Sequence, residues 1–151
     1  MSSYKVLVVD DEADMAETCR KILERKQYAV TVATESQRAL EEIRQQPFDV
    51  VIADLRMPGL DGIEILREAK IVNQDAAVII ITAYATIETA LKAVREGAFD
   101  YIPKPFSMEQ LEVAVERSLA YRQLREENRT LQQQIRQSNH FSRILGNSPQ
   151  I

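Results

Sequence analysis

Short apolar runs alternate with helical patterns through most of the chain, and this alternation limits the possible folds more than any other feature. The runs lie at about residues 4–9, 29–33, 49–53, 77–81 and 99–102. Between them, apolar residues three or four positions apart, such as Leu91 and Val94, predict helices at about 13–26, 35–45, 62–72 and 84–96. The first, third and fourth runs are almost continuously apolar, as in strands that helices cover on both faces. The pattern predicts an α/β fold with a doubly wound, five-stranded parallel sheet.

The composition is that of an ordinary soluble protein, with 45% apolar and 28% charged residues among 151. A net charge of −4 gives no indication of nucleic-acid binding within this segment. Cys19 is the only cysteine, so no internal disulfide is possible, which fits the cytoplasm; its helical spacing favours a buried side chain over a reactive thiol. His140 is the only histidine, so histidine-based chemistry is not expected. No apolar run is long enough to span a membrane.

Polar residues follow four of the five predicted strands. Asp10 and Asp11 follow the first strand, Asp54 the third, Thr82 the fourth and Lys104 the fifth. Because ligands of an open parallel sheet bind outside the carboxyl ends of its strands, we expect these side chains to share one pocket. Each residue alone also has a structural explanation, as a turn-forming Asp, a strand-end Thr or a surface Lys. Their joint placement favours a site.

The chemistry of these residue types points to a metal-assisted phosphoryl acceptor. Asp54 can act as a nucleophile and form an acyl phosphate. Asp10 and Asp11 would repel it unless a divalent ion were present, and Mg²⁺ fits because it prefers oxygen ligands, including the backbone carbonyl of Arg56.

Two further side chains suit the phosphate itself. The ammonium of Lys104 can pair with a carboxylate before the reaction and with phosphate afterwards, and Thr82 offers a hydroxyl. The sequence has no glycine-rich phosphate loop, so nucleotide binding within these residues is not expected.

A different pattern begins at Ser107, which with Gln110 predicts a capped helix start. Farther on, the spacing of five residues gives a heptad seam, with Asn at one a position favouring a two-stranded coiled coil. The seam residues are Tyr121, Leu124, Asn128, Leu131 and Ile135. The alternative is a solvated tail with coincidental spacing. After residue 141 the helical pattern breaks and the sequence ends without finishing an element, which suggests a cut at a domain boundary.

The strand-end motifs closely resemble the receiver domain of two-component response regulators, over about residues 4–120. They are Asp10-Asp11, Asp54, Met57-Pro58-Gly59, Asp61-Gly62, Thr82-Ala83 and Lys104-Pro105-Phe106. The resemblance implies a flavodoxin-like sheet of order 2-1-3-4-5 and phosphorylation of Asp54 by a sensor histidine kinase. It also implies Mg²⁺ held by Asp10, Asp11 and the Arg56 carbonyl, phosphoryl contacts from Thr82 and Lys104, and a cis Lys104–Pro105 bond.

The segments at 54–59, 82–90 and 97–101 look like the nitrogen-regulation type of receiver. That resemblance implies a receiver at 1–120, a coiled-coil linker continuing its last helix at 121–138, and the start of a AAA+ ATPase at 139–151. The stretch 144–149 is similar to the start of that ATPase. In this group the ATPase acts on sigma-54 RNA polymerase and a helix-turn-helix binds DNA; both would lie beyond residue 151.

A route from phosphate to output is hypothesised through Thr82 and Tyr101. Thr82 would move toward the phosphate, Tyr101 would swing inward, and the changed face would alter how two copies pair through the last helix and its linker; alternatively, Tyr101 is a half-buried core aromatic. Two other functions stay open. A Mg²⁺-dependent phosphatase or phosphotransferase would usually need a second Asp where Arg56 stands. A structural dimerisation module would show no dependence on Mg²⁺ or phosphate.

Overall fold

The computed structural model describes the backbone of residues 4–144 and the side chains of residues 4–136. The strands are β1 (Lys5–Val9), β2 (Ala29–Ala33), β3 (Val50–Asp54), β4 (Ala77–Thr82) and β5 (Asp100–Pro103). The helices are α1 (Ala13–Glu24), α2 (Ser36–Gln45), α3 (Gly62–Val72), α4 (Ile87–Arg95) and α5 (Met108–Ile144). The chain divides into two compact units, Met1–Leu119 and Ala120–Ile151.

The five strands form one parallel sheet of order β2-β1-β3-β4-β5, which confirms the predicted class and order. The register aligns the strand ends: Val9 pairs with both Ala33 and Ala53, and Thr82 pairs with Pro103. The carboxyl ends of neighbouring strands therefore lie along one edge of the sheet, where the sequence places its polar residues.

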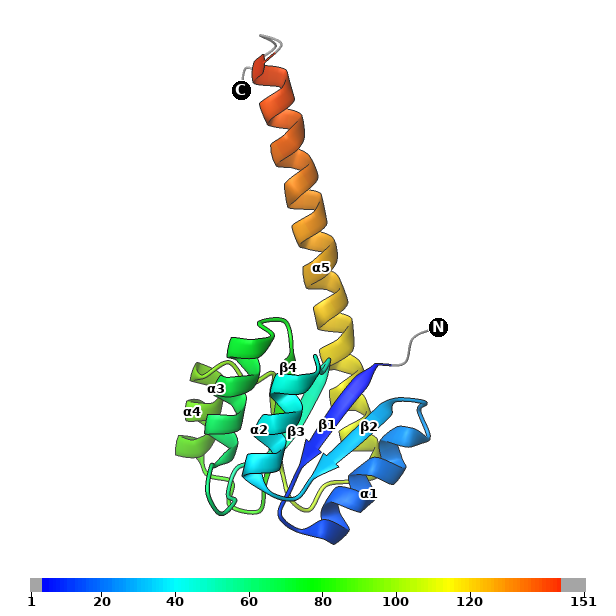
Figure 1. Ribbon diagram of the computed structural model, residues 1–151, viewed down its shortest axis with the longest axis vertical. Helices are drawn as coiled ribbons and strands as arrows, with labels where there is room; N and C mark the ends of the chain where they lie inside the picture. Colours follow the sequence, from blue (N-terminus) through cyan, green and yellow to red (C-terminus); the bar gives the residue numbers. More distant parts are fainter. Residues whose placement is uncertain (1–3, 145–151) are drawn as a thin grey trace. The chain divides into compact units, whose positions relative to one another are not determined.

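Helices cover both faces of this sheet (Figure 1). Leu7 and Val9 belong to a core cluster with residues of α2, α3 and α4, whereas Val6 and Val8 belong to a second cluster with residues of α1 and the first turns of α5. Because successive strand side chains point to opposite faces, a strand between two helical layers buries every residue. All residues of β3 and β4 are buried, as their apolar runs predicted.

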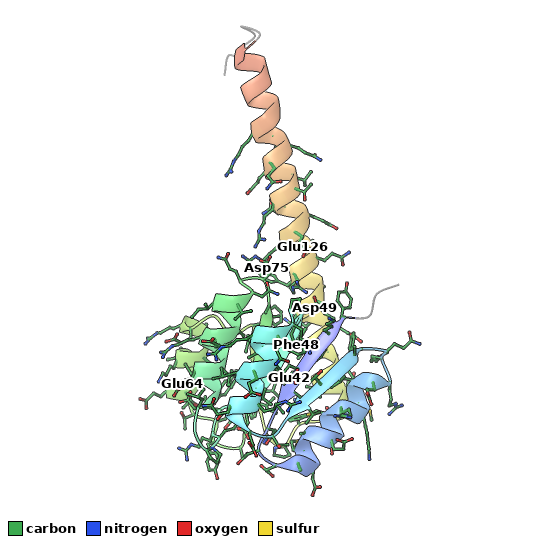
Figure 2. All side chains as sticks on the ribbon, in the orientation of Figure 1. Glu42, Phe48, Asp49, Glu64, Asp75 and Glu126 are labelled. Carbon is green, nitrogen blue, oxygen red and sulfur yellow. The ribbon has the colours of Figure 1, made fainter. Side chains whose placement is uncertain are left out.

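Side-chain contacts stabilise and connect the helices on the α2–α4 face. Glu42 of α2 is labelled in Figure 2. It accepts hydrogen bonds from Arg38, one turn earlier, and from Gln46, directly after the helix. Arg44 of α2 donates to Glu68 of α3, and Arg67 of α3 binds Glu96, directly after α4, through two N–H groups. Such exposed ion pairs contribute little individually, but they connect neighbouring helices.

The start of α4 differs from the sequence prediction: the helix begins at Ile87 rather than near residue 84. Thr86 caps it, because its hydroxyl oxygen accepts the N–H of Thr89 (3.1 Å) while the Thr89 hydroxyl oxygen accepts the N–H of Thr86 (3.1 Å). This reciprocal capping box satisfies two backbone donors that a helix start leaves without partners. The apolar residues that predicted the helix, Leu91 and Val94, are exposed in the structure.

The start of α5 agrees with the predicted capping box. The Ser107 hydroxyl oxygen accepts the N–H of Gln110 (3.1 Å), and the Gln110 side-chain oxygen accepts the N–H of Ser107 (2.8 Å). Leu111, Val115 and Leu119 are buried in the core of the first unit.

In the second unit the four apolar seam residues, Tyr121, Leu124, Leu131 and Ile135, are exposed. The helix continues to Ile144, beyond residue 138, where the sequence placed the end of the linker. The rest of the predicted ATPase start, residues 145–151, lies outside the described residues. None of the helices within residues 4–144 combines the length and apolar character needed to cross a lipid bilayer.

Candidate functional site

Four of the predicted strand-end residues come together at the carboxyl edge of the sheet. Asp10 directly follows β1, Asp54 is the last residue of β3, Thr82 is the last residue of β4, and Lys104 directly follows β5. Their backbone positions follow from the register, because Val9 pairs with Ala53 and the N–H of Lys104 donates to the Thr82 carbonyl (2.7 Å).

Lys104 holds two buried carboxylates side by side. Its Nζ lies 2.9 Å from Oδ2 of Asp10 and 3.0 Å from Oδ2 of Asp54, while Oε1 of Glu12 is 3.5 Å away. Asp10 is 0% exposed and Asp54 5% exposed, so both depend on this pairing to offset their lost hydration. Burial alone would lower the pKa of Lys104, but its hydrogen bonds to Asp10 and Asp54, together with the attraction of their negative charges, outweigh burial and hold that pKa above its usual range. Lys104 is therefore charged at neutral pH.

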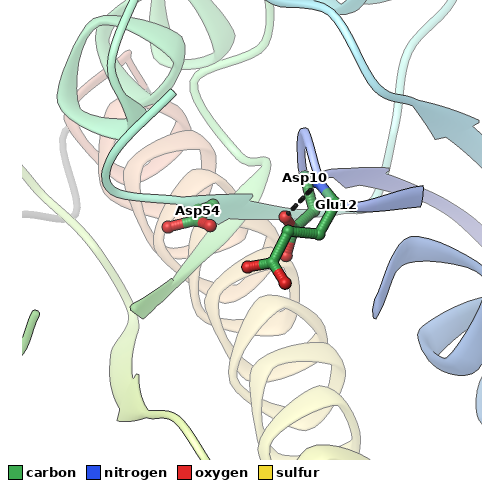
Figure 3. A group of neighbouring side chains, drawn as sticks. All are labelled: Asp10, Glu12 and Asp54. Carbon is green, nitrogen blue, oxygen red and sulfur yellow. Dashed lines mark hydrogen bonds between the residues drawn. The ribbon is translucent and has the colours of Figure 1, made fainter. Parts of the chain in front are cut away.

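Three carboxylates make a cluster that suits a divalent cation (Figure 3). One oxygen each from Asp10, Glu12 and Asp54 lie within 4.8 Å of one another, and the N–H of Glu12 donates to Oδ1 of Asp10 (3.0 Å). Carboxylate oxygens are hard ligands of the kind that Mg²⁺ prefers. The residues present therefore fit the predicted Mg²⁺, with one acidic side chain that the sequence reasoning missed.

Glu12 and Asp11 have different places around this cluster. Sequence reasoning stopped at the adjacent pair Asp10-Asp11, although Glu12 is the third acidic residue in succession after β1. The turn that bonds the Glu12 N–H to Asp10 brings the Glu12 carboxylate back toward Asp54. Asp11 is exposed and lines the adjoining pocket with Asp54, so its role as a metal ligand stays a prediction.

An open pocket of about 490 Å³ leads to Asp54. Its lining comes from the segments after three strands: Asp11 and Glu12 after β1, Arg56 after β3 and Tyr84 after β4. The guanidinium carbon of Arg56 lies 4.3 Å from the centre of the Tyr84 ring, and the N–H of Arg56 donates to Oδ1 of Asp54 (3.2 Å). The Asp54 carboxylate is thus accessible from solvent through this pocket, beside a positive side chain.

The two residues predicted to switch, Thr82 and Tyr101, have different hydrogen-bond partners. Thr82 is 0% exposed, and its hydroxyl oxygen accepts the N–H of Tyr84 (3.0 Å). Tyr101 is half-buried, and its hydroxyl shares a 2.6 Å hydrogen bond with the hydroxyl of Thr89 on α4. Tyr101 therefore bonds to α4 and does not line the Asp54 pocket. The Lys104–Pro105 bond is cis, as the resemblance implied.

Comparison with known proteins finds a matching family, the response regulator receiver domain, over residues 6–116. The chain is similar to the transcriptional regulatory protein ZraR of Escherichia coli (strain K12), with 40% identity over 116 residues, 77% of this chain and 26% of that protein. It is also similar to the regulatory protein AtoC of the same organism, with 37% identity over 145 residues, 96% of this chain and 32% of that protein.

Among solved structures, the solution structure of the beryllofluoride-activated NtrC4 receiver domain dimer has 32% sequence identity and a TM-score of 0.75, covering 78% of this chain and 98% of that one. The chain spans only 26% to 32% of the length of the two curated relatives.

Proposed function

Because the chain belongs to the family of response regulator receiver domains, we propose that Asp54 accepts a phosphoryl group from a sensor histidine kinase and stores it as an acyl phosphate. The observation that carries this proposal is the geometry of Asp54, a carboxylate at a strand end that opens to a pocket while Lys104 bonds to it at 3.0 Å. Lys104 pairs with this carboxylate and orients it, as an attacking nucleophile requires.

The transfer step follows from these positions. A carboxylate oxygen of Asp54 attacks the phosphorus, the bond from phosphorus to the donor nitrogen breaks, and that nitrogen keeps the electron pair. Asp10, Glu12 and Asp54, whose carboxylate oxygens cluster, would hold Mg²⁺, and Asp11 and the Arg56 carbonyl stay predicted ligands at the adjoining pocket. When bound, Mg²⁺ neutralises charge that develops on the phosphoryl group. Lys104 is then within reach of the new phosphoryl oxygens and offers them N–H donors.

Storage fits this site better than turnover. The position two residues after Asp54 holds Arg56, a permanently charged cation, where a phosphatase or phosphotransferase would need an acid–base group. The Arg56 side chain stacks on Tyr84. We therefore place the chain among phosphoryl acceptors rather than enzymes that act on outside substrates.

The proposed output begins with two hydrogen bonds that the phosphoryl group would break. If the Thr82 hydroxyl donates to a phosphoryl oxygen, Thr82 moves away from the N–H of Tyr84, which it now accepts. Space beside β5 then favours Tyr101 turning inward, away from Thr89. Because Thr89 also takes part in the capping box of α4, this movement would alter the α4–β5–α5 face.

At the level of the whole protein, we propose a cytoplasmic homodimer that pairs through α5 and its heptad seam. The relative ZraR is named a transcriptional regulatory protein. From the resemblance to nitrogen-regulation receivers, we further propose that a sigma-54-activating ATPase and a DNA-binding domain follow residue 151 in the whole protein. The NtrC4 structure is that of an activated receiver domain dimer, which supports pairing as the readout.

A phosphodonor experiment tests the proposal directly. The chain is incubated with acetyl phosphate and Mg²⁺, and the bound phosphoryl group is measured by intact mass. We expect one phosphoryl group per chain with slow decay, no label on Asp54→Ala, and normal label on Asp14→Ala, which removes an exposed carboxylate of α1. Continuous release of phosphate over many turnovers would support an enzyme instead. An absence of any Mg²⁺ or phosphate dependence would support a structural dimerisation module.

A further inference from the structure

Ser36, the first residue of α2, connects that helix to the loop between β3 and α3. Its hydroxyl donates to the carbonyl of Pro58 (3.2 Å), and its oxygen accepts the N–H of Leu60 (3.2 Å). Ser36 is 5% exposed, so both bonds lie away from competing water. One side chain thus satisfies a donor and an acceptor two residues apart in another segment.

The residue between these two contacts shows how closely the loop fits around the hydroxyl. Gly59 has φ +88°, a conformation that other residues rarely adopt. A Cβ on Gly59 would lie 2.6 Å from Oγ of Ser36, closer than non-bonded atoms approach. The tip of the loop therefore closes directly onto the Ser36 hydroxyl.

The loop between β3 and α3 also contributes Arg56 and Asp61 to the lining of the Asp54 pocket. The base of the loop is closed by the N–H of Gly62, which donates to the Leu55 carbonyl (2.9 Å), and Asp61 caps α3. Between base and tip lies Arg56, whose N–H donates to Oδ1 of Asp54 (3.2 Å). Because Arg56 and the tip belong to the same short loop, a shift of the tip can be transmitted to the carbonyl and the N–H of Arg56.

We propose that Ser36 is a positioning residue for the Mg²⁺ site: it holds the β3–α3 loop so that the Arg56 carbonyl and the Asp54 carboxylate stay aligned. Ser36 does not itself line the pocket, so it acts only through the loop. This inference rests on the proposed function, because it assumes that the pocket binds Mg²⁺ for phosphoryl transfer. It adds a residue in α2, outside all of the strand-end motifs.

The test compares Ser36→Ala with a matched control, Ser107→Ala. Ser107 also stands at a helix start and also accepts a backbone N–H through its hydroxyl, but its helix is α5. The first measurement is amide hydrogen exchange, which reports the hydrogen bond without any metal. We expect the Leu60 amide to exchange about tenfold faster in Ser36→Ala and at the wild-type rate in Ser107→Ala.

The second measurement is the Mg²⁺ dissociation constant, followed by amide chemical shifts during titration. We expect the Mg²⁺ dissociation constant to increase roughly three- to tenfold in Ser36→Ala and not to change in Ser107→Ala. A misplaced ligand should weaken Mg²⁺ binding by about the free energy of one hydrogen bond. With acetyl phosphate, the half-saturating Mg²⁺ concentration should rise while the rate at saturating Mg²⁺ stays within about twofold. Ser36→Cys, whose thiol bonds more weakly, should give intermediate values and serves if the alanine variant does not fold.

The positioning role of Ser36 and the proposed function of the site can fail separately. Wild-type Mg²⁺ affinity in Ser36→Ala or Ser36→Cys, together with fast exchange at Leu60, would overturn the positioning role and leave the proposed function intact. Equal weakening in Ser107→Ala would also overturn it, because general destabilisation would then suffice. A wild-type chain that neither binds Mg²⁺ nor accepts phosphate would overturn the proposed function, and the positioning role with it.

Discussion

At the scale of single residues, Lys104 decides whether two buried carboxylates can lie side by side. Replacing it with Met leaves Asp10 and Asp54 without their shared cation, and we expect the free energy of unfolding to fall by about 3 kcal/mol in chelator. Urea unfolding measures the change. Added Mg²⁺ should recover part of the loss, because a cation can again lie between the carboxylates.

The matched control for that experiment is Lys92→Met, which removes an exposed lysine from α4. It should change the free energy of unfolding by no more than about 0.5 kcal/mol. A Lys104→Met protein as stable as wild type in chelator would contradict the electrostatic account of the site.

Because the thiol of Cys19 is buried, the free energy of unfolding should fall at high pH. Burial, with a smaller contribution from the charge of Asp10, raises the pKa of its thiol from 9.0 to about 11. Between these values the unfolded chain releases a proton that the folded chain keeps, so stability is complete below pH 9 and falls as the pH rises toward 11.

We expect titration of the thiol to lower the free energy of unfolding of wild type by roughly 2 kcal/mol as the pH rises from about 8 to about 10.5. Urea unfolding of wild type and Cys19→Ala at both pH values measures this, since the variant lacks the titrating group. The same fall with pH in both proteins would show that other groups cause it.

At the scale of elements, the start of α4 links helix capping to the orientation of Tyr101. Thr89→Ala removes half of the capping box and the hydrogen-bond partner of the Tyr101 hydroxyl. Thr86→Ala removes the cap and a hydroxyl contact to Thr89 (3.0 Å), but it leaves the Thr89–Tyr101 hydrogen bond in place. Each change should lower the free energy of unfolding by about 1 kcal/mol. Only Thr89→Ala should shift the ring resonances of Tyr101 by NMR, and equal shifts in both variants would contradict a specific Thr89–Tyr101 lock.

The sheet was predictable from the sequence because its determinants are local or general. The apolar runs of β1, β3 and β4 are buried on both faces, and the handedness of crossovers leaves few possible arrangements. Once strand ends are known, a parallel sheet brings Asp54 and Lys104 to one edge, and the structure gives them a 3.0 Å hydrogen bond. The resemblance to a known family added the strand order.

The features that were missed depend on packing or on turn geometry. Tyr84 and Ala85 are acceptable in a helix, so nothing in the spacing revealed that Thr86 would cap α4 and exclude them. Leu91 and Val94 have helical spacing, but which face the sheet covers is a tertiary property, and α4 buries Ala93 instead. Glu12 joins Asp54 only through the turn after β1, which no periodicity describes.

At the scale of the whole molecule, the exposed apolar residues of the second unit favour pairing of two chains. Leu124 and Leu131 are 63% and 57% exposed, and a helix with so narrow a stripe gains stability chiefly when another helix covers it. We expect wild type to sediment as a dimer at protein concentrations on the order of tens of micromolar. Replacing both leucines with Lys should give monomers, because buried charges oppose pairing.

The control for charge is Gln123→Lys with Gln133→Lys, which adds the same two charges at exposed positions off the seam. It should leave the sedimentation coefficient of the dimer unchanged. Dimers that persist with lysine at both leucine positions would assign pairing to another surface of the chain.

Substitutions of Asn128 test whether the seam specifies a two-stranded, in-register coiled coil or only provides an apolar contact between chains. It is exposed at an a position between Leu124 and Leu131, and a buried Asn there favours two strands in register at some cost in stability. Asn128→Leu should therefore raise the concentration-dependent melting temperature while admitting larger assemblies, and sedimentation equilibrium would show masses above that of a dimer. Asn128→Gln keeps an amide and should remain dimeric with a lower melting temperature. If Asn128→Leu melted at a higher temperature yet stayed strictly dimeric, selection of the two-stranded state would lie with other residues of the seam.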